Sequence, residues 1–252
     1  MSELRTIGPG WPWHHHDELG STNDEARRLA ESGAPHGTVV TAELQRAGRG
    51  RQGRSWVVPR ERALTVSVLL RDLPRPGLLP LAAGVAVADV VGERALLKWP
   101  NDVVLVGRDR PDGEDAGDGA LRKVAGILAE GRPAEGWSIV GIGLNVAVDL
   151  ADLPADVASR AATLGRDPGD LPAVLDDLVR ALDRALALEP AALRERWSAR
   201  DVLRDRPVGW TDGAGTEHAG TAVGIDDDGR LVVRLADGHA RAIDAGDVHL
   251  AR

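Results

Sequence analysis

The segment Gln45–Trp56 constrains the fold most, because it is unsuited to both a helix and a strand. It contains four arginines and three glycines in twelve residues, and a glycine inside a regular element costs about 0.5–1 kcal/mol relative to alanine. The β-branched run Gly37–Leu44 precedes it, while Trp56–Val58 and the alternating run Ala63–Leu70 follow it. Both kinds of run are typical of strands. We therefore expect the chain to leave a sheet, form a loop and return to the sheet.

The composition of this loop predicts an anion-binding site. Glycines allow the backbone to approach a ligand closely, and guanidinium groups bind carboxylate or phosphate oxygens in pairs. Because the arginines repel one another, we expect a mobile loop that orders when an anion binds. The alternative is a basic surface loop that touches nucleic acid. The net charge of −8 argues against a general nucleic-acid binder, which needs a basic face, and favours a small anionic ligand.

Lysine, asparagine and glutamine are rare, and they are clustered. The chain has two lysines, three asparagines and two glutamines, and it has neither Phe nor Tyr. A residue type that is kept at a few positions and replaced elsewhere is expected to be chemically required at those positions. All seven residues fall within five short segments: Ser21–Asn23, Gln45–Trp56, Lys98–Asp102, Arg122–Ile127 and Gly141–Val146.

The rest of the pattern predicts an α+β chain. A helix is expected to begin at Ser21, where Thr22 and Glu25 fit a capping box. Asp/Gly turns near the C-terminus predict a small all-β barrel, and the Asp/Gly-rich loop Gly107–Ala120 is expected to be disordered. The other expected elements are a helix at Leu78–Val91, a hairpin of Val103–Val106 with Lys123–Glu130, a strand at Trp137–Val148, helices from Asp156 to Arg200, and strands at Val208–Thr211, Ala219–Ile225, Leu231–Leu235 and His239–Ile243.

The N-terminal residues 1–16 are rich in Pro, Gly and Trp and end in His14–His16. We expect a flexible leader without a metal site, because three consecutive histidines cannot face one ion and no other residue shows ligand spacing. The absence of cysteine excludes disulfides and thiolate chemistry. The longest apolar run, Leu78–Val91, is too short to span a bilayer, and the N-terminus has no signal-peptide pattern. We therefore expect a soluble, cytoplasmic protein.

Five motifs in chain order resemble those of the biotin–protein ligases, and the C-terminal barrel matches the same family, so the resemblance covers about residues 15–250. It is closest to the monofunctional form without an N-terminal DNA-binding domain. The chain departs from the family pattern in two places: the residues just ahead of the Arg/Gly loop differ from the common sequence, and the loop Gly107–Ala120 is longer than expected. Neither difference affects a motif residue. The motifs are Gly20–Asn23, Gly48–Trp56, Lys98–Asp102, Arg122–Ile127 and Gly141–Asn145.

The resemblance implies a mixed β-sheet flanked by helices, the class II synthetase-like biotin–lipoate ligase fold, with a small SH3-like barrel. The implied domains are the leader 1–16, a catalytic domain 17–204 and the barrel 205–252. The implied reaction joins biotin to MgATP to give biotinyl-5′-AMP, and then transfers biotin to a lysine of a carrier. The implied partner is the biotin carboxyl carrier domain of acetyl-CoA or acyl-CoA carboxylase. Neither a nucleic acid nor a membrane is an expected partner. The enzyme itself is expected to be a monomer or a weak homodimer.

The resemblance also implies residue roles. Catalysis is assigned to Lys123, Arg51 and Asp102, where Asp102 either orients the incoming lysine or holds Mg²⁺. Lys98 is either functional or a structural partner of Asp102. The implied biotin-binding residues are Ser21, Thr22, Asn23, Gln45, Arg49, Gly50, Arg51, Lys123 and Gly126. The implied ATP- and adenylate-binding residues are Arg49, Arg51, Arg54, Trp56, Asn101, Lys123 and Asn145.

Two other functions remain open at this point. The first is a lipoate or octanoate transfer enzyme, which also uses a central lysine, although the Lys98–Asp102 motif and the Arg/Gly loop favour biotin. The second is a biotin-binding or DNA-binding regulator without turnover. The acidic net charge of −8 argues against its DNA-binding version.

Overall fold

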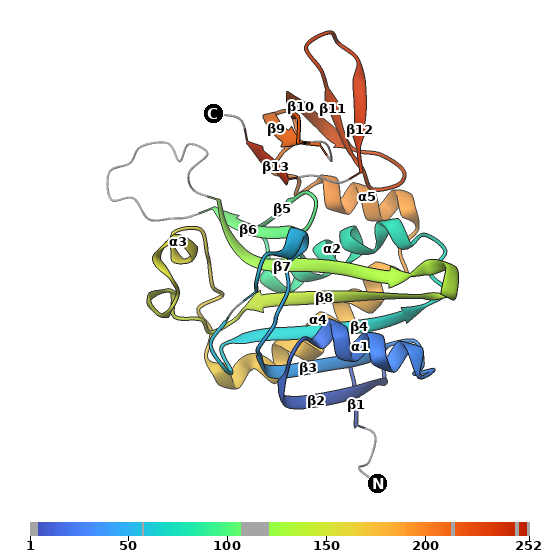
Figure 1. The fold of residues 1–252 in the computed structure, drawn as a ribbon, viewed down its shortest axis with the longest axis vertical. Coiled ribbons are helices and arrows are strands. Elements are labelled where there is room, and N and C mark those ends of the chain that lie inside the picture. Colours follow the sequence, from blue (N-terminus) through green and yellow to red (C-terminus); the bar gives the residue numbers. More distant parts are fainter. Residues whose placement is uncertain (1–4, 57, 107–120, 213–214, 245–246, 251–252) are drawn as a thin grey trace.

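The computed structural model describes residues 5–56, 58–106, 121–212, 215–244 and 247–250. Its larger part is built on an eight-stranded sheet in the order β1-β2-β3-β4-β8-β7-β6-β5 (Figure 1). Neighbouring strands are antiparallel except for the parallel pair β2 and β3. The strands are β1 Arg5–Ile7, β2 Trp11–Leu19, β3 Thr38–Gln45, β4 Ala63–Arg71, β5 Ala95–Lys98, β6 Asp102–Val106, β7 Leu121–Arg132 and β8 Trp137–Asn145.

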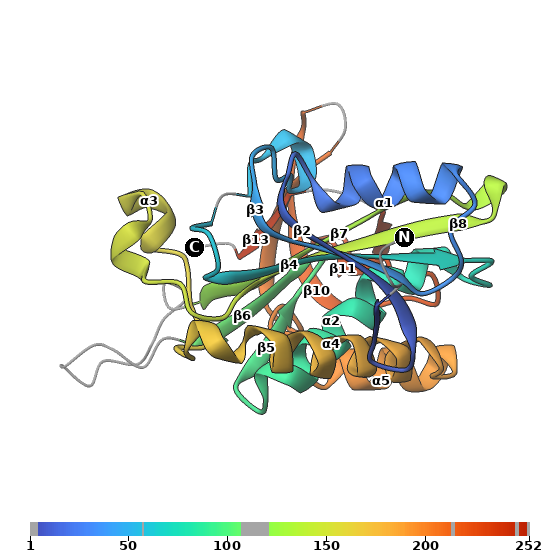
Figure 2. The same ribbon diagram turned by 90° about the horizontal axis from the view of Figure 1, so that it is seen from below.

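Helices cover both faces of this sheet. Figure 2 shows α1 on one face and α2, α4 and α5 on the other. Helix α2 is apolar at every position except Asp89 and is largely buried, as its run of small apolar residues predicts. None of the described helices is both long and apolar enough to cross a membrane. The helices are α1 Thr22–Glu31, α2 Leu79–Val91, α3 Ala155–Ala158, α4 Leu171–Leu186 and α5 Pro190–Ser198, and the 3-10 turns are η1 Arg51–Gly53, η2 Pro76–Leu78, η4 Pro133–Glu135, η5 Leu150–Asp152 and η6 Pro168–Asp170.

The alternation of side chains along β8 connects the two cores. Val140 and Ile142 face the large core that α2 and α4 cover, whereas Ile139 faces a smaller core beneath α1, where it meets Ala26 and Ala30. Successive strand residues point to opposite faces, so a strand apolar at nearly every position is buried on both sides. This arrangement confirms the expected mixed sheet with helices on its two faces.

The expectation of a flexible leader is wrong for residues 5–7 and 11–16, which belong to β1 and β2. Burial of tryptophan outweighs the Pro- and Gly-rich composition. Trp11 is buried against the backbone at Gly37, and Trp13 Nε1 donates to Thr41 Oγ1 at 2.9 Å. Large aromatic rings contribute much apolar area to a core, and here they hold β2 alongside β3. The other predicted domain boundaries remain predictions.

Two local expectations are also wrong. Helix α1 is capped by Ser21 without a side-chain cap hydrogen bond, because the Thr22 hydroxyl is buried and lies 3.1 Å from Gln45 Oε1 instead. Trp56 and Val58 do not belong to a strand; Trp56 N donates to Gly48 O at 2.8 Å, which closes the Arg/Gly loop on itself. The expected disorder of Gly107–Ala120 concerns residues outside the described ranges.

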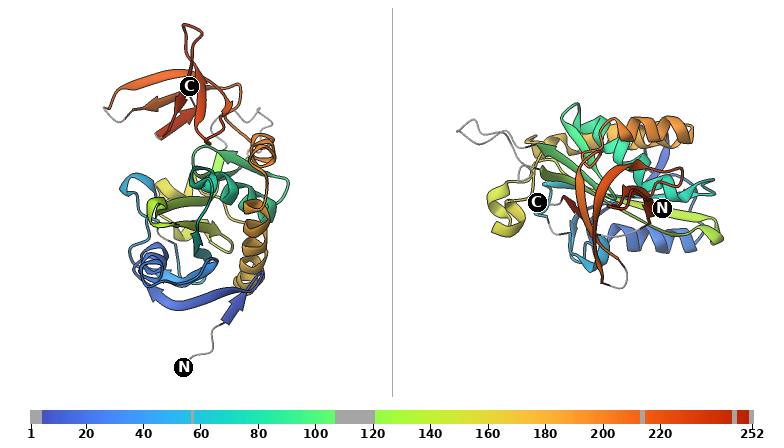
Figure 3. Two further views of the ribbon diagram at one scale, coloured as in Figure 1. Left: turned by 90° about the vertical axis from the view of Figure 1, so that its right-hand side faces the viewer. Right: turned by 90° about the horizontal axis from the view of Figure 1, so that it is seen from above.

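The C-terminal part is a five-stranded antiparallel sheet in the order β12-β11-β10-β9-β13, set on one end of the larger part (Figure 3). Its edge strands β12 and β13 do not pair with each other within the residues described, so the expected small barrel is an open, SH3-like sheet. The predicted strands are present, and β13 was not predicted. The strands are β9 Pro207–Thr211, β10 Glu217–Ile225, β11 Leu231–Arg234, β12 Ala240–Ile243 and β13 Asp247–Leu250.

A turn of the C-terminal sheet docks onto the larger part next to the Lys98–Asp102 motif. Trp99 Nε1 donates to Gly229 O at 3.0 Å. A side chain at Gly229, whose φ is +80°, would lie 3.2 Å from Leu81 and 3.3 Å from Leu78. A left-handed backbone and close packing both favour glycine here. The contact joins the motif directly to the C-terminal sheet.

The segment that leads into the C-terminal sheet pairs with β5. Leu97 N donates to Arg200 O at 2.8 Å, and Val202 N donates to Leu97 O at 3.0 Å. Between these bonds lies Asp201, whose Oδ2 is buried without a hydrogen-bond partner. Burial raises the pKa of the Asp201 carboxyl from 3.8 to about 6, against the opposing hydrogen bond from Leu203 N. The folded protein thus keeps a proton that the unfolded chain releases near pH 4.

This proton predicts how stability depends on pH. Because the folded-state pKa is raised, the free energy of unfolding falls as the pH rises from about 4 to about 6. The neutral variant Asp201→Asn should flatten that fall and gain on the order of 2 kcal/mol above pH 6, since one pKa unit is about 1.4 kcal/mol and the carboxyl is incompletely desolvated. Urea unfolding at pH 4.5 and 7.5 measures the gain, with the variant Asp183→Asn, at an exposed position of α4, as control. An equal gain at both pH values would contradict the prediction.

Candidate functional site

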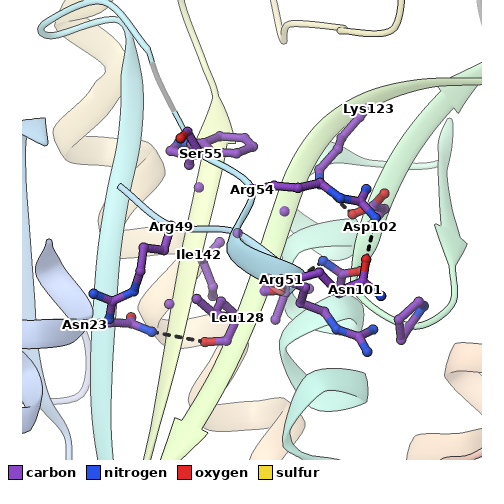
Figure 4. A pocket seen from close by; sticks show the side chains of 18 of the residues that line it. Asn23, Arg49, Arg51, Arg54, Ser55, Asn101, Asp102, Lys123, Leu128 and Ile142 are labelled. Carbon is purple, nitrogen blue, oxygen red and sulfur yellow. Dashed lines mark hydrogen bonds and ion pairs between the residues drawn. The ribbon is translucent and has the colours of Figure 1, made fainter. Parts of the chain in front are cut away.

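The motif segments converge on one cavity of about 180 Å³, formed by the start of α1, the Arg/Gly loop, the Lys98–Asp102 turn and strands β7 and β8. Figure 4 shows Asn23 and Arg49 on one side, Asn101, Asp102 and Lys123 on the other, with Ile142 and Leu128 between them. The cavity is lined by Ser21, Thr22, Asn23, Gln45, Arg49, Gly50, Arg51, Gln52, Arg54, Ser55, Trp56, Lys98, Trp99, Pro100, Asn101, Asp102, Lys123, Gly126, Ile127, Leu128, Gly141, Ile142, Gly143 and Val248.

All but one of the residues predicted for the site line this cavity. Asn145 does not: its side chain is buried, and Nδ2 donates to Ala162 O at 2.9 Å. Asn145 O also accepts from Leu164 N at 2.9 Å, while Lys123 O accepts from Ala162 N at 2.8 Å. Asn145 therefore holds the 162–164 segment behind Lys123. Its role on the nucleotide side remains a prediction.

One end of the cavity carries a polar cluster of the buried Thr22, Asn23 and Ser67 with the half-buried Gln45. Gln45 Oε1 accepts from Thr22 N at 2.8 Å. Ser67 Oγ lies 2.7 Å from Thr22 Oγ1 and 2.6 Å from Asn23 Oδ1, and Thr22 Oγ1 lies 3.1 Å from Gln45 Oε1. Two hydroxyl protons serve these three contacts, since each hydroxyl donates only one. The cluster is therefore one donor short.

Asn23 also connects this cluster to a group of charges. Its Nδ2 donates to Glu130 Oε2 at 2.7 Å. Arg49 binds Asp24 through two hydrogen bonds, of 2.6 and 2.7 Å, and lies 3.5 Å from Glu130. This two-pronged pairing is the strong form of a guanidinium–carboxylate contact. It lowers the pKa of Asp24 and raises the pKa of Arg49. Arg49 thus fixes the loop to α1 and β7.

The backbone of the Arg/Gly loop is folded tightly. Gly50 N donates to Arg54 O at 2.7 Å, and the 3-10 turn η1 lies between these residues. A side chain at Gly48 would collide with the backbone at Trp56 and lie 3.1 Å from Gln45 Nε2. Glycine is required where two backbones approach this closely. The fold-back presents Arg51 and Arg54 at the cavity.

At the other end, Lys123 Nζ lies 2.6 Å from Asp102 Oδ1. The Lys123 side chain is 35% exposed and that of Asp102 24%, so both remain accessible from the cavity. Asp102 Oδ1 is buried and makes no well-aligned hydrogen bond; the short distance nevertheless identifies an ion pair. Of the two alternatives for Lys98, the one in which it is the structural partner of Asp102 is therefore wrong. The two are cross-strand neighbours, but Asp102 binds Lys123.

The ring of Trp56 occupies a platform made by two glycines. Gly126 on β7 faces Gly143 on β8 in the sheet register. A side chain at Gly143 would collide with the Trp56 ring, and one at Gly126 would lie 2.9 Å from Lys123 Cε and 3.3 Å from Trp56. Lys123 Nζ lies 5.7 Å from the centre of the ring, a cation–π distance. Trp56 Nε1 is buried without a hydrogen-bond partner.

Several residues of the site were not predicted. Glu130 follows Gly126 and Leu128 at every second position of β7 and faces the same side, so strand alternation contained the signal. Ser67 supports the polar cluster from β4, where its run of apolar neighbours hid it. Val248 reaches the cavity from the C-terminal sheet, and no local pattern indicates such a long-range contact.

A second cavity, of about 820 Å³, adjoins the first along the Arg/Gly loop and Trp99. Its far wall is the C-terminal turn that carries Asp228, Gly229 and Arg230. A long substrate with parts in both cavities would therefore touch both parts of the chain.

The chain matches two family models: the biotin/lipoate A/B protein ligase family over residues 19–147 and the biotin protein ligase C-terminal domain over residues 206–250. It is 34% identical to the biotin–acetyl-CoA-carboxylase ligase of Mycobacterium tuberculosis, over 96% of this chain and 91% of that protein. A ligase of the same description from Paracoccus denitrificans is 33% identical, over 85% of this chain and 90% of that protein.

The fold agrees with these matches. A biotin protein ligase from Aquifex aeolicus, solved in complex with biotin and ATP, superposes with a TM-score of 0.71 at 26% identity, over 95% of this chain and 98% of that one. The sheet, the C-terminal part and both matched segments therefore point to one assignment. The chain belongs to the biotin/lipoate A/B protein ligase family.

Proposed function

We propose that this chain is an ATP-dependent biotin–protein ligase. The biotin carboxylate attacks the α-phosphorus of ATP, which forms a carboxyl–phosphate bond and releases pyrophosphate. The amine of a carrier lysine then attacks the carboxyl carbon of biotinyl-5′-AMP, loses a proton and displaces AMP. The observation that supports this proposal most is that Asn23 of the polar cluster lies at one end of the cavity, whereas the cationic Arg54 and Lys123 lie at the other.

The polar cluster favours biotin over octanoate or lipoate. The ureido ring of biotin offers N–H donors and a carbonyl acceptor, which suits a cluster that lacks one donor and holds Thr22, Asn23 and Gln45. An alkyl chain offers no donor and would leave the cluster one donor short, at a cost of about 1–3 kcal/mol for the unpaired acceptor. A site built to hydrogen-bond its substrate discriminates strongly against an analogue without those groups.

The cationic end suits the adenylation step. A carboxylate and a triphosphate repel each other, so fixed positive charge has to bring them together. We assign Arg51 and Lys123 to the reacting carboxylate and phosphate oxygens, and Arg49, Gly50 and Arg54 to the loop that holds them. Closure of this loop over the adenylate would exclude water, and that movement remains a prediction.

The nucleotide is assigned to the side of Trp56 and Asn101. The Trp56 ring lies against Gly126 and Gly143 and lines the cavity, where it can pack against a planar group. Asn101 Nδ2 donates to Ile127 O at 3.2 Å, and its side chain lines the cavity. The stacking partner of Trp56 is thus proposed to be part of the adenylate.

The cavity offers a side chain suited to magnesium, the carboxylate of Asp102. Asp102 is the one carboxylate among the described residues that line it, and Mg²⁺ commonly binds one or two carboxylates together with substrate phosphates. Asp102 would contribute that ligand when the ion arrives with ATP, where the ion neutralises phosphate charge. The alternative role for Asp102, orienting the carrier lysine, uses the same oxygen atoms.

The proposed partner is the biotin carboxyl carrier domain of acetyl-CoA or acyl-CoA carboxylase. This proposal rests on the names of the similar ligases. Either a monomer or a weak homodimer would serve the reaction, and a cytoplasmic location would place the enzyme with its carrier.

The first test identifies the acyl-adenylate by mass spectrometry. The protein is incubated with MgATP and either biotin or octanoate. Biotinyl-5′-AMP and pyrophosphate are expected with biotin, and no adenylate with octanoate, because only biotin pairs the polar cluster. Octanoyl-adenylate would assign the chain to the lipoate branch of the family. The absence of both products would favour a binding protein without turnover.

The variant Lys123→Arg should lose at least about tenfold in the rate of pyrophosphate release. A planar guanidinium cannot replace a compact ammonium that follows moving oxygens, and the bulkier group would also crowd Gly126 and the Trp56 ring. The comparison variant is Lys98→Arg, which changes the other lysine of the same cavity, a residue without an ion pair to any described carboxylate. The rate of pyrophosphate release should fall less in Lys98→Arg than in Lys123→Arg. An equal fall in both variants would contradict the proposed role of Lys123.

The variant Ser67→Ala tests the polar cluster. It leaves Asn23 Oδ1 without its short contact, so the KM for biotin should rise about five- to tenfold while the KM for ATP changes little. Ser138→Ala is the matched control, because Ser138 is buried in the same sheet and does not line the cavity. A rise of both KM values together would indicate general damage to the fold.

A further inference from the structure

The histidine run at residues 14–16 takes no part in the proposed reaction, yet β2 divides it between two faces. Successive strand residues point to opposite sides, so His15 and Asp17 share one face while His14 and His16 share the other. None of these residues lines either cavity. The run therefore presents one histidine, not three, on the side that carries Asp17.

The neighbouring strand β3 adds a second carboxylate to that face. His16 pairs with Ala42 and Glu18 with Leu44 in the parallel register, which places Glu43 beside Asp17. A ligand atom from each of His15, Asp17 and Glu43 lies within 4.8 Å of the other two. We propose that these three side chains bind a divalent transition-metal ion of the zinc type.

The imidazole of His15 is already oriented for this role. Its Nδ1 lies 2.9 Å from Thr41 Oγ1, while Nε2 faces Glu43 Oε1 at 3.7 Å. Trp13 Nε1 donates to the same Thr41 oxygen at 2.9 Å. A hydroxyl oxygen has two lone pairs and can accept from both rings. When Nδ1 carries the proton, Nε2 is free to bind a metal, and such an outer hydrogen bond is the usual support of a metal-binding histidine.

The charges on this face also favour a cation. Two carboxylates opposite each other on adjacent strands repel. Arg60 binds Glu43 through Oε2 at 2.6 Å, which leaves Oε1 toward His15. Asp17 has no cationic partner among the residues described. An ion held by His15 Nε2, Asp17 and Glu43 Oε1 would relieve the repulsion and leave the Arg60 contact in place.

The donor set selects the class of metal. One imidazole nitrogen with two carboxylates matches Zn²⁺ and similar first-row ions, whereas Ca²⁺ and Mg²⁺ prefer oxygen ligands alone. Three protein ligands on an exposed face leave the remaining positions to water. The ion would fasten β2 to β3 just before Ser21 and Gln45, the residues with which these strands enter the proposed biotin site.

Zinc titration of the full chain tests the site. The EDTA-treated protein competes with a chromophoric chelator for Zn²⁺, and one equivalent is expected to bind. His15→Ala and Asp17→Asn should each weaken binding at least about tenfold, since even loss of an outer-shell partner costs about 10–100-fold. Zinc should also raise the melting temperature of the unaltered protein but not that of Asp17→Asn, which should melt like the unaltered protein in EDTA.

His14→Ala is the matched control, because it shortens the same histidine run on the opposite face and should leave zinc binding unchanged. An equal loss in His14→Ala and His15→Ala would overturn the proposal, since the run itself would then hold the ion. Asp17→Asn with unaltered affinity, or no stoichiometric binding by the unaltered protein, would overturn it as well.

Discussion

The facing pair Gly126 and Gly143 is the constraint on which the rest of the cavity depends. With no side chain at either position, β7 and β8 leave room for the Trp56 ring. The position of Trp56 in turn closes the Arg/Gly loop, because its backbone N–H is bound by Gly48 O. Lys123 then extends beside the ring toward Asp102. One register of two strands thus fixes the aromatic ring, the loop and the central lysine together.

Charge compensation is the second principle of the site. Arg49 is neutralised by Asp24 and Glu130, and Lys123 by Asp102. An anionic ligand that recruits either cation has to replace a carboxylate which already holds it. The binding energy of such a ligand is therefore a difference between two ion pairs, and that difference decides which anions are bound. Groups that can match the planar fork of Arg49 compete best for it.

Much of this arrangement could be predicted from the sequence, because the scarce residues Asn23, Gln45 and Lys123 cluster in short segments that the fold brings together. Local signals failed where long-range packing decided the outcome. Burial of Trp11 and Trp13 turned a Pro- and Gly-rich leader into a strand. The local sequence predicted that Thr22 caps α1, but its hydroxyl contacts Gln45, which is distant in the sequence. The partner of Asp102 depended on which neighbouring strand carried the lysine, and strand order is not a local property.

The docking of the C-terminal turn has a consequence for how the molecule unfolds. Trp99, Leu78 and Leu81 belong to one continuous core with Trp210 and Leu231 of the C-terminal sheet. If that sheet separated, it would expose these apolar side chains and remove the acceptor of the Trp99 N–H group. The two parts therefore stabilise each other's folded state through this shared core. The motif that carries Asp102 therefore keeps the hydrogen bond of Trp99 only while the C-terminal sheet stays docked.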